Sequence, residues 1–478
     1  MTVVYGLMGG WLERYAAKEL ARYLGRITGQ KQVVLSDQDY AYHDLSEQDQ
    51  PIFLVGDNLV AQSLVEDGSI QIPSNLGEDG FLIKSARFGE AACLLLRGAT
   101  PRGTLYAVYH YLEKYLKVGF FWDGEHIPKS SAIPFEGIHE VQIPRFQKRI
   151  YLGGGYTTFC WGWEEWKREV EWAVRKKLNI LFPPSGSRVV WRKVLKEFGV
   201  AQEPLSRGDK LRSQQVRRII SFARRLGLTT ISPGYSGEIG KPGSLKPPMQ
   251  NMLDALADSA SFIRAHPETE YRYFKWGATP PQTIIHPLDP MFIKFGKRIL
   301  IEHKRAYGTD HLYFQGPPGE SSIGATPEER RHIKVDMAKA MTKLLEDVDS
   351  EAVWLTDSWR FQDRKVWPKE DVRAFLDAIP DEKLLIYDTW ADANPLYKEL
   401  DYFFGKYWCF GSIHSFGGNT YLHGDLEDII SRAKDVASDP KANRCIGFTL
   451  APEIIHHNHL YYDLLSKLAW NPADVELD

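Results

Sequence analysis

Residues 311–344, HLYFQGPPGESSIGATPEERRHIKVDMAKAMTKL, contain a strand, a loop and a helix in that order. The strand candidate HLYFQG is short and largely apolar, and the loop after it is rich in Gly and Pro. The letters TPEE at 326–329 form a capping box with Pro at the first helical position, so we predict that a helix begins there. The residues on its apolar face are Ile333, Met337, Ala340, Met341 and Leu344.

The same order of a short apolar strand and an amphipathic helix recurs along the chain. The other strand candidates are RIYLGG at 149–154, LNILFP at 178–183, LTTISPG at 228–234, AVWLTDS at 352–358, KLLIYD at 383–388, YWCFGSI at 407–413 and CIGFTL at 445–450. Eight strands that alternate with helices predict a (β/α)8 barrel, which we place at residues 145–472. A doubly wound open sheet is the alternative, but no glycine-rich phosphate loop follows any of the strands.

The first part of the chain has a different pattern. We predict helices around 12–24 and 105–115 and strands at 51–55 and 91–97, which indicates a small α+β domain over residues 1–135. Residues 128–144 contain several Pro and Ser residues and show no helical or strand period. We therefore predict that they link this domain to the barrel.

The composition excludes several classes of protein. Lys plus Arg number 59 and Asp plus Glu number 62, a net charge of −3 that gives no electrostatic reason to expect nucleic acid or an anionic membrane as a partner. The four cysteines lie far apart without metal-ligand spacing, and no segment is long and apolar enough to span a membrane or to act as a secretory signal. We expect a cytoplasmic protein without cofactor or metal. The oligomeric state is not indicated.

Aromatic residues make up 13% of the chain, which is typical of a carbohydrate site or of a Trp-rich core. Two glutamates, Glu320 and Glu453, stand beside Gly and Pro in loops that follow predicted barrel strands, where barrel enzymes place their catalytic groups. Glycoside hydrolysis requires two carboxyl groups on opposite sides of the scissile bond. The alternative is that both are solvated loop residues.

Further candidates for sugar binding also follow the predicted strands. They are Trp276, Trp359, Trp390, His414 and Asn419. Each has a structural alternative: the tryptophans could belong to the core, His414 could be a hydrogen-bonded residue of the barrel rim, and Asn419 could supply a left-handed turn. The cluster of His456, His457 and His459 lacks a carboxylate motif, so we expect no metal site.

These residues and their spacing resemble glycoside hydrolase family 89, the α-N-acetylglucosaminidases. The matching stretches include WGWEEWKREVEWAVRKKLNILFPPSGSRVVW, HPLDPMFIKFGKRILIEHKRAYGTDHLY, AVWLTDSWRF, IHSFGGN and GFTLAPE. The resemblance implies retaining hydrolysis of a terminal α-linked N-acetylglucosamine without a metal. It assigns Glu320 as acid/base, Glu453 as nucleophile, and Trp276, Trp359 and His414 to the sugar pocket.

The chain also departs from the family pattern. Gly319 replaces an Asn before the acid/base, Pro184 replaces a Trp, and Ser187-Arg188 replaces Gln-Glu. On the first strand, Arg149-Ile150-Tyr151 replaces an Asn-x-Cys that contacts the sugar in the family, and the resemblance thus makes Tyr151 a further candidate for sugar binding. We therefore expect a retaining exo-glycosidase with an altered glycone pocket, and the two added arginines make an acidic sugar conceivable. The alternative is a carbohydrate-binding protein without activity. The family continues with an α-helical domain, which we expect to be absent or truncated here.

Overall fold

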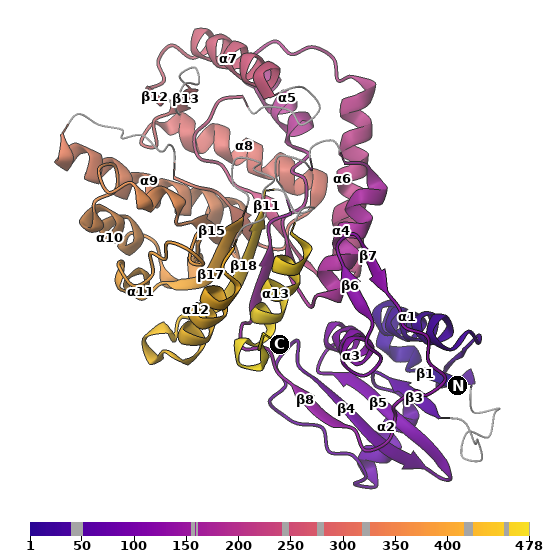
Figure 1. Cartoon of the computed structure of the whole chain (residues 1–478). Coiled ribbons are helices and arrows are strands. Elements are labelled where there is room, and N and C mark those ends of the chain that lie inside the picture. Colours follow the sequence, from indigo (N-terminus) through magenta and orange to yellow (C-terminus); the bar gives the residue numbers. More distant parts are fainter. Residues whose placement is uncertain are drawn as a thin grey trace.

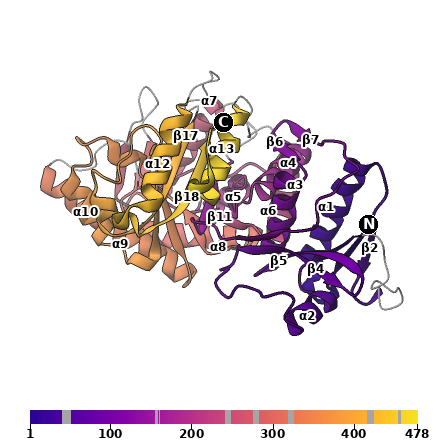
Figure 2. The ribbon, with the colours of Figure 1, turned by 60° about the horizontal axis from the view of Figure 1, so that its bottom comes forward.

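The computed structural model describes residues 1–39, 51–153, 158, 161–240, 248–274, 282–317, 326–414, 424–453 and 458–477. An N-terminal mixed sheet lies beside a closed barrel surrounded by helices, as Figures 1 and 2 show. The predicted fold class, a (β/α)8 barrel preceded by a small α+β region, is therefore confirmed. No helix in the described part of the chain has the length and apolar character needed to cross a bilayer.

The N-terminal sheet has six strands in the order β2-β1-β3-β5-β4-β8. Their bounds are β1 Thr2–Tyr5, β2 Val33–Ser36, β3 Ile52–Val55, β4 Phe81–Phe88, β5 Ala91–Gly98 and β8 His139–Gln142. Strand β8 pairs with β4 in antiparallel orientation. The prediction that residues 128–144 are only a linker is therefore wrong for 139–142, and this sheet continues past the boundary predicted at residue 135.

Helices cover both faces of this sheet. Alternate residues of a strand point to opposite sides, so Val3 packs with helices α1 (Gly10–Thr28) and α3 (Pro101–Lys114), whereas Val4 packs with α2 (Leu59–Glu66). Helix α3 begins as the sequence TPRG suggests, with the Thr100 side chain accepting a hydrogen bond from the Gly103 N–H.

A short hairpin follows α3 and lies on the barrel side of this sheet. It consists of β6 (Gly119–Phe121) and β7 (Gly124–His126), which pair in antiparallel orientation. Both views show the hairpin next to the first barrel helix, α4 (Figures 1 and 2).

Eight parallel strands close the barrel in the order β10-β11-β14-β15-β16-β17-β18-β9. Their bounds are β9 Lys148–Tyr151, β10 Ile180–Leu181, β11 Thr229–Pro233, β14 Leu312–Phe314, β15 Val353–Asp357, β16 Leu384–Asp388, β17 Tyr407–His414 and β18 Cys445–Pro452. All eight predicted strands are confirmed. Because β9 pairs with both β10 and β18, the sheet has no open edge, which rules out the doubly wound alternative.

Helices follow the barrel strands along the chain. They are α4 Trp163–Arg175, α5 Ser187–Glu197, α6 Arg207–Arg225, α7 Pro248–Ala265, α8 Pro290–Tyr307, α9 Pro327–Val348, α10 Lys369–Asp377, α11 Asp401–Phe404, α12 Leu426–Ser438 and α13 His459–Trp470. The predicted start of α9 is confirmed, since the Thr326 hydroxyl accepts a hydrogen bond from the Glu329 N–H at 3.1 Å.

The long connection between β11 and β14 has secondary structure of its own. It contains α7, a hairpin of β12 (Tyr271–Phe274) and β13 (Gln282–Ile285), and α8. Trp276 falls between the two strands of this hairpin, outside the described residues.

Candidate functional site

The carboxyl ends of the barrel strands define the candidate site, because catalytic residues of this architecture lie there. The predicted site residues that the structure describes are Tyr151, Trp359, Trp390, His414 and Glu453. Those that lie outside the described residues are Glu320, Trp276 and Asn419. The assignment of Glu320 and Glu453 as the catalytic pair therefore stays a prediction.

Glu453 directly follows β18 and is half-buried. Its backbone N–H donates to the carbonyl oxygen of His414 at 3.3 Å, which ties the connection after β18 to the end of β17. Burial raises the pKa of Tyr387 and of Tyr462 well above the usual value, and the negative charge of Glu453 adds to both shifts. Tyr387 belongs to the core inside the barrel and Tyr462 to α13, so the charge of Glu453 acts on residues of both regions.

Trp359 and Trp390 form an aromatic pair on neighbouring loops. Trp359 follows β15 and Trp390 follows β16, and their ring centroids are 6.1 Å apart with an interplanar angle of 44°. Both side chains are half-buried, in contrast to the fully buried Trp354 on β15. This partial exposure at the carboxyl ends of two strands favours the platform interpretation over the core alternative.

The loop that carries Trp390 is held by a buried carboxyl group. Asp388, at the end of β16, accepts hydrogen bonds at 2.9 Å from the Ser358 hydroxyl and from the backbone N–H groups of Leu396 and Tyr397. Burial raises its pKa to about 7, against the effect of these hydrogen bonds. Asp388 therefore fixes the conformation of the loop, and its carboxyl oxygens already accept the hydrogen bonds of these three donors.

A second buried carboxyl group, Asp392, contacts Tyr461, which also contacts His414. It accepts hydrogen bonds from the Ser412 hydroxyl at 3.0 Å and from the Tyr461 hydroxyl at 2.7 Å, and burial raises its pKa to about 6. The His414 ring stacks on Tyr461 at 4.3 Å, and the Tyr462 hydroxyl lies 3.4 Å from His414 Nδ1. His414 is 1% exposed, so its predicted contact with sugar stays a prediction. Sequence reasoning missed Asp392 because its partners are far away along the chain.

The structure corrects the expected place of Tyr151. Ile150 and Leu152 point into the barrel interior, so Tyr151 between them points outward to the helices, where it packs against Trp172 at 5.5 Å. Tyr151 is fully buried and its hydroxyl donates to Glu169 on α4. Burial raises the pKa of Glu169 to about 7. An effect of Tyr151 on a ligand in the barrel mouth would therefore be indirect.

The two arginines that suggested an acidic sugar, Arg149 and Arg188, both form ion pairs with carboxylates of other elements. Arg149 also points outward from β9, is fully buried, and pairs with Asp79 of the N-terminal region at 2.5 Å. Arg188 on α5 pairs with Asp209 on α6 at 3.1 Å. The expectation of added positive charge in the sugar pocket is therefore not supported for either residue.

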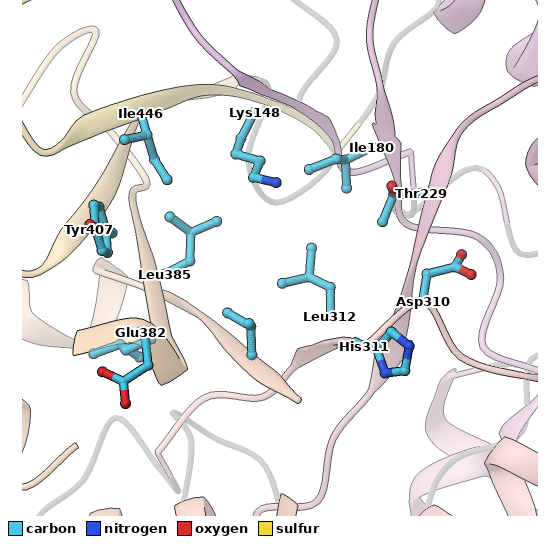
Figure 3. Close-up of a pocket in the computed structure, with 12 residues that line it drawn as sticks. Lys148, Ile180, Thr229, Asp310, His311, Leu312, Glu382, Leu385, Tyr407 and Ile446 are labelled. Carbon is cyan, nitrogen blue, oxygen red and sulfur yellow. The ribbon is translucent and has the colours of Figure 1, made fainter. Parts of the chain in front are cut away.

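A pocket of about 310 Å³ opens at the opposite end of the barrel (Figure 3). Its lining includes Ile180, Leu312 and Leu385 from strands, with the Lys148 side chain directed inward and Glu382 at the rim. These positions are at the amino ends of the strands, away from the ends where barrels carry catalytic groups. The described residues contain no group of three His, Cys, Asp or Glu side chains that could hold a metal ion.

Comparisons with known proteins agree with this architecture. The family model described as the "Alpha-N-acetylglucosaminidase (NAGLU) tim-barrel domain" matches residues 151–207 and 209–472, and the "Glycosyl hydrolase family 67 N-terminus" model matches residues 12–111. The human protein named α-N-acetylglucosaminidase is 24% identical over 428 residues, covering 81% of this chain and 54% of the human protein. The chain thus spans about half the length of this relative.

Solved structures show the same fold. A family 89 glycoside hydrolase from Clostridium perfringens, in complex with 2-acetamido-1,2-dideoxynojirmycin, has a TM-score of 0.72 and 16% identity, covering 97% of this chain and 49% of that one. The same enzyme with two glutamates changed to glutamine, in complex with its substrate GlcNAc-alpha-1,4-galactose, has a TM-score of 0.71 with the same identity and coverage. The family model of the barrel domain matches more than half of the residues of this chain. The chain therefore belongs to the α-N-acetylglucosaminidase family, family 89 of the glycoside hydrolases.

Proposed function

We propose that the chain is a retaining exo-glycosidase that removes a terminal α-linked sugar, with Glu453 as nucleophile and Glu320 as general acid/base. The observation that carries this proposal is the family match, which runs through both glutamates and coincides with the position of Glu453 at the carboxyl end of β18. The bacterial relative with two altered glutamates and bound substrate is consistent with a chemistry of two carboxyl groups.

The proposed reaction has two steps. In the first, the Glu320 carboxylic acid gives its proton to the glycosidic oxygen while the Glu453 carboxylate attacks the anomeric carbon, and a covalent glycosyl-enzyme forms as the alcohol leaves. In the second, the Glu320 carboxylate removes a proton from a water molecule that attacks the same carbon, and the Glu453 carboxylate is released. Each inversion reverses the other, so the sugar retains its configuration.

The described residues support two parts of this scheme. The hydrogen bond to His414 limits the movement of the Glu453 backbone, and a nucleophile gains rate when it is held close to the anomeric carbon. The half-buried rings of Trp359 and Trp390 offer apolar faces on which a pyranose can stack. Both features are at the same end of the barrel.

The names of the relatives make α-linked N-acetylglucosamine the first sugar to test. We further propose that the preferred glycone differs from it, because Gly319 and Pro184 replace residues that the family uses at these positions. An unpaired polar group of the substrate costs about 1–3 kcal/mol. Arg149 and Tyr151 do not support a different glycone, since both side chains point away from the barrel interior.

A panel of aryl α-glycosides, including the N-acetylglucosaminide, tests the activity. We expect turnover of at least one member, strong loss in Glu320→Gln and Glu453→Gln, and an α-configured first product by NMR. Azide distinguishes the roles: it should give an α-glycosyl azide with Glu320→Ala, because it replaces water after the first step, and a β-glycosyl azide with Glu453→Ala. Sugar binding without turnover of any glycoside would favour the non-catalytic alternative.

A further inference from the structure

The β6–β7 hairpin of the N-terminal region is fixed against the barrel. Glu125 on β7 accepts a hydrogen bond from Arg26 on α1 at 2.6 Å and pairs with Arg175 on α4 at 3.2 Å. The same carboxylate accepts from the Tyr23 hydroxyl on α1. These contacts hold the hairpin turn, which contains Trp122 and Asp123, in a defined position beside α4.

Trp122 forms a hydrogen bond with the buried carboxyl group of Glu169 on α4. Its indole Nε1–H donates to Glu169 at 2.6 Å, and the other oxygen of Glu169 accepts from the Tyr151 hydroxyl at the end of β9. Glu169 is 1% exposed. One carboxyl group thus connects the N-terminal hairpin, helix α4 and the end of β9.

The ring of Trp122 also contacts two connections that follow barrel strands. It stacks on Trp161, in the connection after β9, with centroids 6.1 Å apart and an angle of 29°. It stacks on His459, the first residue of α13, at 5.7 Å and 13°. His459 Nε2 lies 3.8 Å from the Asp123 carboxylate in the same turn.

His459 is only 459 − 453 = 6 positions after Glu453. Glu453 is held by its backbone hydrogen bond to His414, and His459 is held by the stack on Trp122. The second contact comes from outside the barrel. It lies at the seam where β18 and β9 pair and close the sheet.

We propose that Trp122 is a positioning residue, through which the N-terminal region fixes the start of α13 and thereby influences the position of Glu453. The inference rests on the proposed glycosidase function. A displacement of about 1 Å in a reacting group can cost on the order of 100-fold in rate. We therefore expect the rate to fall when loss of the stack displaces Glu453 by a distance of this order.

The test compares full-length Trp122→Ala, Trp122→Phe and His459→Ala with the matched control Phe121→Ala. Phe121 is in the same hairpin and is 44% exposed. With an aryl glycoside that the wild type hydrolyses, we expect kcat to fall about 10- to 100-fold in Trp122→Ala with a smaller change in KM, and to be unchanged in the control. Trp122→Phe, which keeps a ring for stacking, should recover part of the loss.

A double variant distinguishes positioning from general packing. If the Trp122–His459 stack is the anchor, Trp122→Ala with His459→Ala should be little slower than Trp122→Ala alone, because the change at Trp122 already removes that stack. Losses that multiply would overturn the proposal, as would a lower melting temperature with unchanged kcat. If Trp122→Ala fails to fold, His459→Ala and Trp122→Phe provide the same comparison.

Amide hydrogen exchange gives a readout that needs no turnover. We expect faster exchange at the start of α13, around residues 459–462, in Trp122→Ala and not in Phe121→Ala. Unchanged exchange there would refute the anchor even in an active enzyme. Faster exchange in a protein that hydrolyses no glycoside would instead show that the anchor exists and that the proposed function is wrong.

Discussion

Asp79 and Arg149 form a buried ion pair that joins the N-terminal region to the first strand of the barrel. A nitrogen of Arg149 lies 2.5 Å from an oxygen of Asp79, and the two side chains are 0% and 4% exposed, respectively. The other Asp79 oxygen pairs with Arg102 at 2.6 Å. The Arg149 guanidinium also donates to the carbonyl oxygens of Phe146 and Lys177, so its donors are well satisfied.

Asp79→Ala should destabilise the protein by about 3–5 kcal/mol, because it leaves a buried guanidinium without its counter-charge. Urea unfolding measures the change. Lys343→Ala is the matched control, since its pair with Asp347 on α9 is exposed and should contribute less than ~1 kcal/mol. Equal effects of the two changes would contradict the buried-pair interpretation.

Glu169 should make the stability depend on pH. Its pKa is raised from 4.5 to about 7 by burial in the folded state. Between these values the folded protein binds more protons than the unfolded one, so the free energy of unfolding falls as pH rises from about 4.5 to 7 and then levels off. Glu169→Gln removes this titration. Relative to wild type, the variant should gain up to ~3 kcal/mol between pH 4.5 and pH 8.

Urea unfolding of wild type and Glu169→Gln at several pH values tests this expectation. Glu164→Gln is the control, because Glu164 is an exposed carboxyl group on the same helix. If Glu169→Gln and wild type differ by the same amount at pH 4.5 and pH 8, Glu169 does not titrate in this range.

Glu320→Gln should reduce hydrolysis most for glycosides with poor leaving groups. A good leaving group departs with little protonation, so the loss of the general acid affects it least. The measurement is kcat/KM over a series of aryl glycosides whose phenols differ in pKa. An equal loss across the series would remove Glu320 from the acid/base role.

Trp359→Ala should weaken sugar binding while leaving the fold intact, because the ring is half-buried beside Trp390. We predict the same for Trp276. Trp354→Ala provides the contrast: this ring on β15 is 1% exposed, and its removal should cost about 3–5 kcal/mol of stability. Calorimetric titration with sugar and thermal unfolding separate the two outcomes. A loss of stability in Trp359→Ala as large as in Trp354→Ala would make Trp359 a core residue.

The sequence by itself determined the eight barrel strands and their order. Each barrel strand is a short apolar run, and the start of α9 depends on contacts between Thr326 and Glu329, three positions apart. Such local signals can be read without knowledge of the rest of the chain. The edge strand β8 was missed because it is short and its pairing with β4 bridges more than fifty residues.

Only the tertiary structure decided which way the residues of β9 point. Period two puts Arg149 and Tyr151 on one face and Ile150 on the other, but both faces of a parallel barrel strand are buried, so the pattern does not indicate the inner one. The partners of the outer face, Asp79 and Glu169, come from distant parts of the sequence. The contact between Trp122 and His459 also depends on the tertiary structure. Contacts between such remote segments exist only after the barrel has closed and the N-terminal hairpin has packed against it.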